Sequence, residues 1–180
     1  MHRVRRWLLP AGVAVVALDQ VTKTWAVNAL DDGRTIHVVW TLQFALGFNS
    51  GMAFSKATGL GPFIGIVATL AIVFILASLR KAESASSVFG MALVAAGAAG
   101  NVIDRLLRGD AWFRGSVVDF IDLQWWPVFN IADSAITIGG VLVILGALRA
   151  GDHEESGGTA ESEDAPHASG AGHLPGGGPA

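Results

Sequence analysis

Three stretches of this chain are long, apolar and almost free of charge. Residues 57–79 and 84–103 contain no charged residue, and residues 129–148 contain only Asp133. A helix rises about 1.5 Å per residue, so roughly 20 apolar residues cross the hydrocarbon core of a bilayer. Each stretch therefore predicts a membrane-spanning helix.

A fourth helix is predicted over residues 7–29, where an apolar first half is followed by Asp19 and Lys23. The alternative is a secretory signal peptide, because basic residues precede the apolar run and residues 27–29 resemble a cleavage site. We favour an uncleaved helix. The apolar pattern continues to Trp25, and an acid and a lysine are unusual in the apolar part of a signal peptide.

The composition of the chain also indicates a membrane protein. The chain is 52% hydrophobic and 15% charged, whereas soluble domains are about 25% charged. This composition argues against an ordinary soluble enzyme. The chain has no cysteine, which excludes disulfides, cysteine nucleophiles and thiolate metal sites.

Charge divides the chain in two. Residues 151–180 hold six of the 15 acidic residues and none of the 12 lysines and arginines, giving −6, so residues 1–150 carry +3. The last 30 residues are also rich in glycine and proline and lack apolar periodicity. We predict a transmembrane domain over 1–150 and a disordered, acidic cytoplasmic tail over 151–180.

Lysine and arginine also predict the orientation. They are dense before the first helix, at residues 80–81 and after the fourth helix, and sparser in the segments 30–56 and 108–128. The positive-inside rule then places both termini in the cytoplasm. In the outer segments, 37–48 is rich in β-branched and aromatic residues and predicts a strand or hairpin, and 116–126 predicts a second extended piece.

The polar exceptions in this apolar chain all fall toward the outer ends of the predicted helices or beside them. They are Asp19, Lys23, Asn101, Asp104, Arg105, Asp119, Asn130 and Asp133. A charge at a helix centre in a bilayer costs roughly 2.5–3.5 kcal/mol on translocon scales. Convergence of so many polar groups at one leaflet indicates a site.

Each group also has a structural interpretation. Asp19 and Lys23 have the i,i+4 spacing of a helical ion pair. Asn101 shares a helix face with Asp104 and Arg105, where polar groups can hydrogen-bond between helices. Asn130 is suited to cap the fourth helix, with Asp133 at its third position.

Few kinds of chemistry fit this residue set. A His-Glu-x-x-His zinc site, a glycine-rich phosphate loop and a serine in a nucleophile context are all missing from the sequence. Carboxylates remain. Two aspartates that share a proton can activate a water and protonate a leaving amine, as in aspartic proteases.

Five motifs in order resemble the lipoprotein signal peptidase family, also called signal peptidase II. They are DQVTK (19–23), NSGMAF (49–54), GNVIDR (100–105), VVDF (117–120) and FNIADSAI (129–136). The resemblance implies an all-α membrane protein with four transmembrane helices, a small extracytoplasmic β-cradle and a short interfacial helix. Two departures are Met52, where the family often has a smaller residue, and a longer stretch before VVDF.

By this resemblance the catalytic pair is Asp119 and Asp133, with Asp104 as the rival for the first aspartate. The 14 residues from Asp119 to Asp133 leave enough chain for Asp119 to fold back over the start of the fourth helix. The resemblance implies supporting or substrate-binding roles for Asp19, Lys23, Asn49, Gly51, Gly100, Asn101, Asp104, Arg105, Asn130 and Ala132. We expect no metal and no organic cofactor.

The implied activity is that of an intramembrane aspartic endopeptidase. It would cut prolipoproteins before a diacylglyceryl-modified cysteine. Because the dipole of the fourth helix favours an ionised Asp133, we expect Asp133 to act as base and Asp119 as acid. We expect a monomer in the bacterial plasma (inner) membrane, in contact with lipid and not with nucleic acid, with its active site at the outer leaflet. The alternatives are a small four-helix transporter or proton-path subunit, and a scaffold in which the polar groups only join helices.

Overall fold

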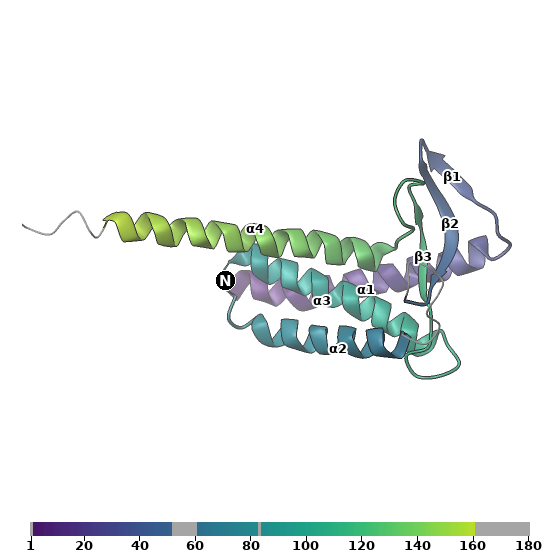
Figure 1. The fold of residues 1–180 in the computed structure, drawn as a ribbon, viewed down its shortest axis with the longest axis horizontal. Helices are drawn as coiled ribbons and strands as arrows, with labels where there is room; N and C mark the ends of the chain where they lie inside the picture. Colours follow the sequence, from purple (N-terminus) through teal and green to yellow (C-terminus); the bar gives the residue numbers. More distant parts are fainter. Residues whose placement is uncertain (1, 52–60, 83, 161–180) are drawn as a thin grey trace, which may run out of the picture.

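The computed structural model describes residues 2–51, 61–82 and 84–160, and the side chains of 5–51, 61–82 and 84–149 among them. Four helices form a bundle with a three-stranded sheet at one end (Figure 1). In chain order the elements are α1 (His2–Leu30), β1 (Ile36–Val39), β2 (Leu42–Asn49), α2 (Gly61–Ser78), α3 (Ala85–Leu107), β3 (Val117–Asp122) and α4 (Ile131–Ala160). Met52 and residues 161–180 lie outside the described residues.

Three helices are long and apolar enough to cross a membrane: α2, α3 and the part of α4 over Ile131–Arg149. They correspond to the three uncharged stretches, which are confirmed as helices. α1 is also a continuous helix, but it is not among these three because its second half carries Asp19, Gln20 and Lys23.

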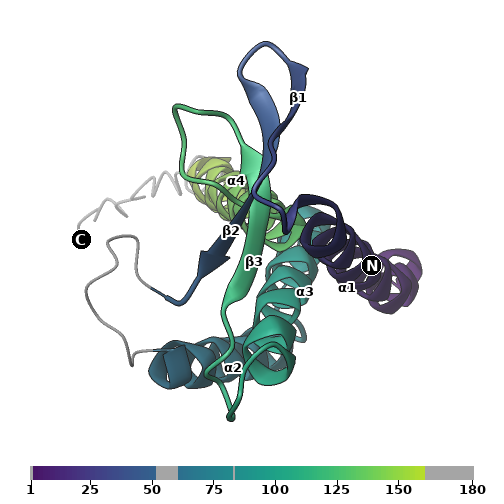
Figure 2. The ribbon, with the colours of Figure 1, turned by 90° about the vertical axis from the view of Figure 1, so that its right-hand side faces the viewer.

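α3 packs against the other three helices, and the end-on view shows it between them (Figure 2). The backbones of α3 and α4 approach closely where Gly90 faces Gly139, since a Cβ atom on Gly90 would lie 2.5 Å from the carbonyl oxygen of Gly139. Small residues permit this approach between apolar helices. In the described part of the chain, α1 and α2 contact α3 but not each other.

The sheet confirms the predicted outer strands. β1 and β2 form an antiparallel hairpin, and β2 pairs antiparallel with β3, which gives the order β1-β2-β3. Phe120 of β3 is buried against Ala26 and Leu30 of α1. Trp25 of α1 makes edge contacts with Phe44 and Phe120, so this hydrophobic core fixes the sheet on the end of α1.

The described residues contain no short interfacial helix, and residues 52–60 lie outside them, so this helix stays a prediction. The segment after α3 is a tight loop, in which the amide of Gly115 bonds back to the carbonyl of Arg105 at 3.0 Å and the backbones of Gly109 and Gly115 lie close together.

One feature differs from the expectations. The predicted boundary between residues 150 and 151 is crossed by α4, which ends at Ala160. Each further residue of an existing helix adds one hydrogen bond without a new nucleation cost. Disorder of the tail stays a prediction for residues 161–180, which lie outside the described part.

Candidate active site

The predicted polar residues meet at the end of the bundle that carries the sheet. They come from α1, α3, β3 and the start of α4, segments that are far apart in the sequence. Asp19, Lys23, Asp104 and Asn130 are completely buried, and Asp119 is 5% exposed. So many buried polar groups require hydrogen-bond partners, and the contacts divide them into two sets.

The first set, here called the Lys23 cluster, consists of Asp19, Lys23, Asn101 and Asp104. The ammonium of Lys23 lies 2.9 Å from Asp19 Oδ2, 2.8 Å from Asp104 Oδ2 and 2.9 Å from Asn101 Oδ1. An ammonium group has three donors, so all three are used. The predicted ion pair between Asp19 and Lys23 is confirmed within α1. The contacts of Lys23 with Asn101 and Asp104 join α1 to α3.

Asp104 is saturated with donors. Besides Lys23, its carboxylate accepts from Arg108 Nε at 2.9 Å and Gln20 Nε2 at 3.2 Å. The backbone amide of Val118 also donates to it at 3.2 Å. Asp104 therefore ties β3 and α1 to α3, and its oxygens have little remaining capacity to bind a water.

Asp19 links the cluster to the first turn of α4. Its Oδ1 accepts the backbone N–H of Ala132 at 2.9 Å, which satisfies one of the amides that a helix start leaves unpaired. Ala132 is fully buried. Gly100 leaves the space for this contact, because a Cβ atom there would lie 2.6 Å from Asp19 Oδ2.

The second set centres on Asn130, which caps α4 as predicted. Its Oδ1 accepts the backbone N–H of Asp133 at 2.9 Å, and Asp133 Oδ2 accepts the backbone N–H of Asn130 at 3.3 Å. This reciprocal pair is a capping box. Asn130 Nδ2 also donates to Asp119 Oδ1 at 2.6 Å, so one asparagine contacts both aspartates.

Asp133 is held from a second direction by α3. Asn101 Nδ2 donates to Asp133 Oδ1 at 2.8 Å, while Asn101 Oδ1 accepts from Lys23. Asn101 therefore connects the Lys23 cluster to the aspartate pair, Asp119 and Asp133.

The chain folds back between the two aspartates, as the sequence predicts. Phe129 forms an isolated antiparallel bridge with Ile121 of β3, with backbone bonds of 2.8 and 3.0 Å between them. Successive residues of a strand face opposite sides, so Phe120 enters the core on α1 while Asp119 faces Asn130. The bridge thus holds β3 beside the start of α4, so that Asp119 meets Asn130.

The pKa of Asp119 is raised to about 6, first by burial and then by the nearby charge of Asp133. Hydrogen bonds from Asn130 and Asn49 and the charge of Lys23 act in the opposite direction. A carboxyl group with this pKa can hold or release a proton near neutral pH.

Arg105 lies apart from the Lys23 cluster although it follows Asp104 directly. It is 6% exposed, and its Nη1 has no hydrogen-bond partner among the described residues. Its guanidinium borders Gly51, where a Cβ atom would lie 3.6 Å from Nη1. Asn49 Oδ1 accepts the N–H of Gly51 at 2.9 Å, and Gly51 has a φ of 108° that favours glycine.

The sequence interpretation missed two members of this network, Gln20 and Arg108. Gln20 Nε2 donates to Asp19, to the carbonyl of Gly100 and to Asp104. Arg108 pairs with Asp104 four residues earlier. The i,i+4 spacing pointed to Arg108, whereas Gln20 carried no charge to mark it. The described residues hold no group of three or more histidine or acidic side chains suited to a metal.

Comparison with known proteins identifies the family that this chain resembles. The family model described as signal peptidase (SPase) II matches residues 11–149. A lipoprotein signal peptidase of Mycobacterium leprae is 38% identical over 78% of this chain and 70% of its own length. One of Rhodococcus jostii is 36% identical over 80% and 73%. A solved structure titled as a bacterial membrane enzyme matches with a TM-score of 0.69 and 32% identity, covering 79% of this chain and 87% of that one.

Proposed function

The chain belongs to the signal peptidase II family, and we propose that it removes signal peptides from prolipoproteins with Asp119 and Asp133 as its catalytic pair. It is a peptidase, and the substrate is a prolipoprotein cut just before a diacylglyceryl-modified cysteine. The observation that carries the assignment is the contact of Asn130 with both carboxylates, at the N-terminus of α4.

The proposed reaction uses one water held between the two carboxylates. Asp133 takes a proton from the water as the water oxygen attacks the carbonyl carbon of the scissile peptide bond. Asp119 gives its proton to the departing nitrogen as the C–N bond breaks. The products are a signal peptide with a new carboxyl terminus and a lipoprotein whose lipid-modified cysteine has a free amine.

The division of roles follows the environments of the two groups. Asp133 lies in the first turn of α4, where the helix dipole and two amide donors favour a negative charge. Asp119 has a pKa raised to about 6 and is the better proton carrier. Interacting carboxylates titrate as a pair, so the roles describe one protonation state of that pair.

Asp104 is a positioning residue in this proposal. Its oxygens already accept from Lys23, Arg108, Gln20 and Val118, whereas Asp119 accepts from the side chains of Asn130 and Asn49. Asp19, Lys23, Gly100, Asn101 and Ala132 hold the start of α4, while Asn49, Gly51 and Arg105 line the approach from β2.

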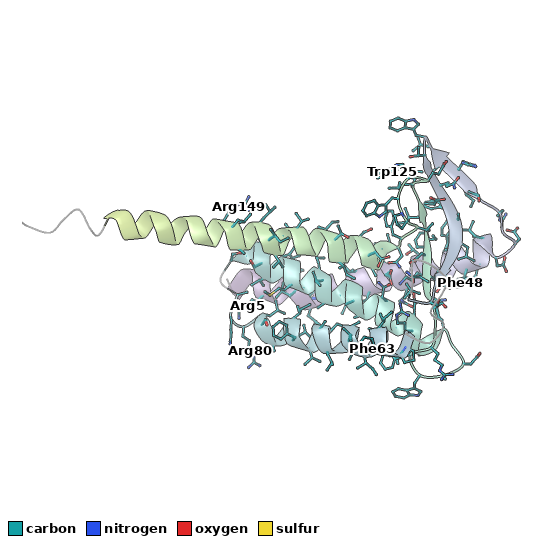
Figure 3. All side chains as sticks on the ribbon, in the orientation of Figure 1. Arg5, Phe48, Phe63, Arg80, Trp125 and Arg149 are labelled. Carbon is teal, nitrogen blue, oxygen red and sulfur yellow. The ribbon has the colours of Figure 1, made fainter. Side chains whose placement is uncertain are left out.

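Four membrane-spanning helices, cytoplasmic termini and a site at the outer leaflet complete the proposal. Arg5, Arg80 and Arg149 lie at the end of the bundle away from the sheet (Figure 3), as the positive-inside rule expects for a cytoplasmic end. At the sheet end the side chains of Trp40, Trp112 and Trp125 are 96%, 82% and 70% exposed. Exposed tryptophans suit a membrane–water interface. The protein acts as a monomer in contact with lipid.

A transporter needs ionisable groups near the membrane midplane with access from both sides. The buried ionisable side chains of the described residues gather at the sheet end, and α2 contains no charged residue. This distribution favours the peptidase over the transporter or proton-path subunit.

The test uses the purified full-length protein in detergent with a diacylglyceryl-modified prolipoprotein. Asp119→Asn and Asp133→Asn should each abolish release of the signal peptide, while Asp110→Asn, a change at an exposed acid of the outer loop, should leave it intact. Cleavage at the unaltered rate by either of the first two variants would refute the pair. Loss of cleavage in Asp104→Asn alone, in a folded protein, would move the first aspartate to Asp104.

A further inference from the structure

A groove of about 620 Å³ lies on the face of α3 between α1 and α2. It exists because α1 and α2 each pack on α3 while their backbones stay apart in the described part of the chain. It runs from Arg5 on α1 and Leu79, the residue after α2, to Gln20, with Ala96 of α3 on its floor. The aspartate pair does not line it, so the groove is separate from the active site.

The dimensions of the groove suit one extended hydrocarbon chain. Arg5 and Gln20 are 15 residues apart on α1, which corresponds to roughly 22 Å. The volume of about 620 Å³ divided by this length gives a cross-section of about 28 Å². A helix of about 10 Å diameter has a cross-section of roughly 80 Å². The groove is therefore too narrow to enclose a transmembrane helix but wide enough for an acyl chain.

The two ends of the groove differ in charge. Gln20 closes one end, and its amide N–H groups already bond to Asp19, Gly100 and Asp104. At the other end, the only hydrogen bonds of Arg5 to described residues are long ones of 3.4 and 3.5 Å to the carbonyls of Leu79 and Ala82. These carbonyls bracket Arg80 and Lys81 in the sequence, and Arg5 and Arg80 lie at the same end of the bundle (Figure 3).

An arginine guanidinium has five donors and matches phosphate oxygens in geometry. The open end of the groove thus offers cationic donors where a lipid headgroup would lie, and the remainder offers an apolar channel.

We propose that this groove is a binding site for a phospholipid with an anionic headgroup. One acyl chain lies along α3 between α1 and α2, and the headgroup phosphate contacts Arg5 with Arg80 and Lys81 beside it. The bound lipid fills a space that the protein leaves open and joins α1 to α2. The site goes beyond the peptidase activity, and in the proposed orientation it opens to the leaflet opposite the active site.

A signal peptide is a poor occupant on two grounds. Its helix is too wide for the groove, and its basic N-terminal region would face Arg5, Arg80 and Lys81, which carry the same charge. An anionic phospholipid fits the width of the groove and complements the positive charge at its open end.

The experiment is native mass spectrometry of the full-length protein in detergent, titrated with phosphatidylglycerol or with phosphatidylcholine of identical acyl chains. One basic residue near an anionic lipid surface contributes about fivefold in affinity. We expect phosphatidylglycerol to bind at least fivefold more tightly. Arg5→Gln should remove most of this preference, whereas Arg6→Gln, which makes the same charge change beside the groove, should retain it.

Ala92→Phe places a ring in the groove, because Ala92 lines it, and should reduce occupancy by both lipids. Val67→Phe adds a ring on the exposed face of α2 away from the groove and should not. Equal affinity for the two lipids, or equal losses in Arg5→Gln and Arg6→Gln, would overturn the proposal. So would displacement of bound lipid by an apolar helical peptide. Because the arginine variants do not alter packing, their lipid affinities test the proposal even if Ala92→Phe fails to fold.

Discussion

The Lys23 cluster and the aspartate pair share the sheet end of the bundle, but their polar atoms are used differently. Lys23 has all three donors bonded, and Asp104 accepts from four donors. Asp119 accepts from the side chains of Asn130 and Asn49 and keeps a raised pKa. A buried polar group that is fully bonded stabilises the fold, whereas one that is only partly bonded can still bind and react.

The largest effect on stability should come from the centre of the Lys23 cluster. Among the described residues, Lys23→Met removes the only cation that Asp19 contacts and one of two that Asp104 contacts. Loss of one partner from a buried ion pair costs about 3–5 kcal/mol, so the free energy of unfolding in detergent should fall by that amount.

Arg34→Met is the matched control, because it breaks a pair with Asp32 in which both side chains are more than half exposed. Exposed pairs contribute about 0–1 kcal/mol. Equal losses of unfolding free energy in Lys23→Met and Arg34→Met would show that burial of the Lys23 cluster does not raise the cost of removing its cation.

A smaller loss should follow from crowding the contact between Asp19 and the start of α4. Gly100→Ala places a Cβ atom 2.6 Å from Asp19 Oδ2, and overpacking of this kind costs about 1–3 kcal/mol. In Gly140→Ala nothing lies within 4 Å of the new atom, so this variant should be neutral or slightly more stable. Denaturant titrations of both variants in one detergent test the difference.

Asn130 should affect catalysis more than stability. Asn130→Ala removes the cap of α4, at about 0.5–2 kcal/mol, together with its contacts to both aspartates. Ser84→Ala removes the cap of α3, whose side chain accepts the N–H of Ser87, and should cost similar stability. Only Asn130→Ala should reduce kcat, by roughly tenfold or more, as expected for a misplaced catalytic group. A similar fall in kcat in Ser84→Ala would mean that Asn130 acts only as a cap.

The smallest expected effect is on the pH dependence of kcat/KM. If Asp119 supplies a proton, kcat/KM should fall as pH rises above about 6, where Asp119 loses that proton in the free enzyme. Asn49→Ala removes a hydrogen bond that lowers this pKa, so the descending limb should move to higher pH. A kcat/KM that continues to rise well above pH 6 would contradict Asp119 as the acid.

Much of this arrangement follows from local sequence patterns. The uncharged runs predicted α2, α3 and α4, and i,i+4 spacing predicted the pair of Asp19 and Lys23. Asn130 followed by Asp133 predicted the cap of α4. These interactions lie within one helix or one turn, so residue spacing is sufficient to predict them.

Contacts between distant segments were beyond such patterns. Gln20 and the amide of Val118 meet Asp104 only because α1 and β3 both pack on α3. The groove depends on α1 and α2 remaining apart on α3, which no single helix encodes. The close approach of Gly109 and Gly115 in the loop after α3 is likewise set by backbone contacts that no periodicity marks.

The most direct test of the central claim compares Asp119→Asn with Asp104→Asn, measuring peptide cleavage and unfolding free energy for both. The folded protein holds the Asp119 proton more tightly than the usual pKa of 3.8 allows. Ionising Asp119 therefore costs stability as pH rises from 3.8 to about 6. At neutral pH, Asp119→Asn should lose cleavage while keeping or gaining stability, and Asp104→Asn should lose stability. Cleavage retained in Asp119→Asn, or lost only together with the fold, would contradict the account.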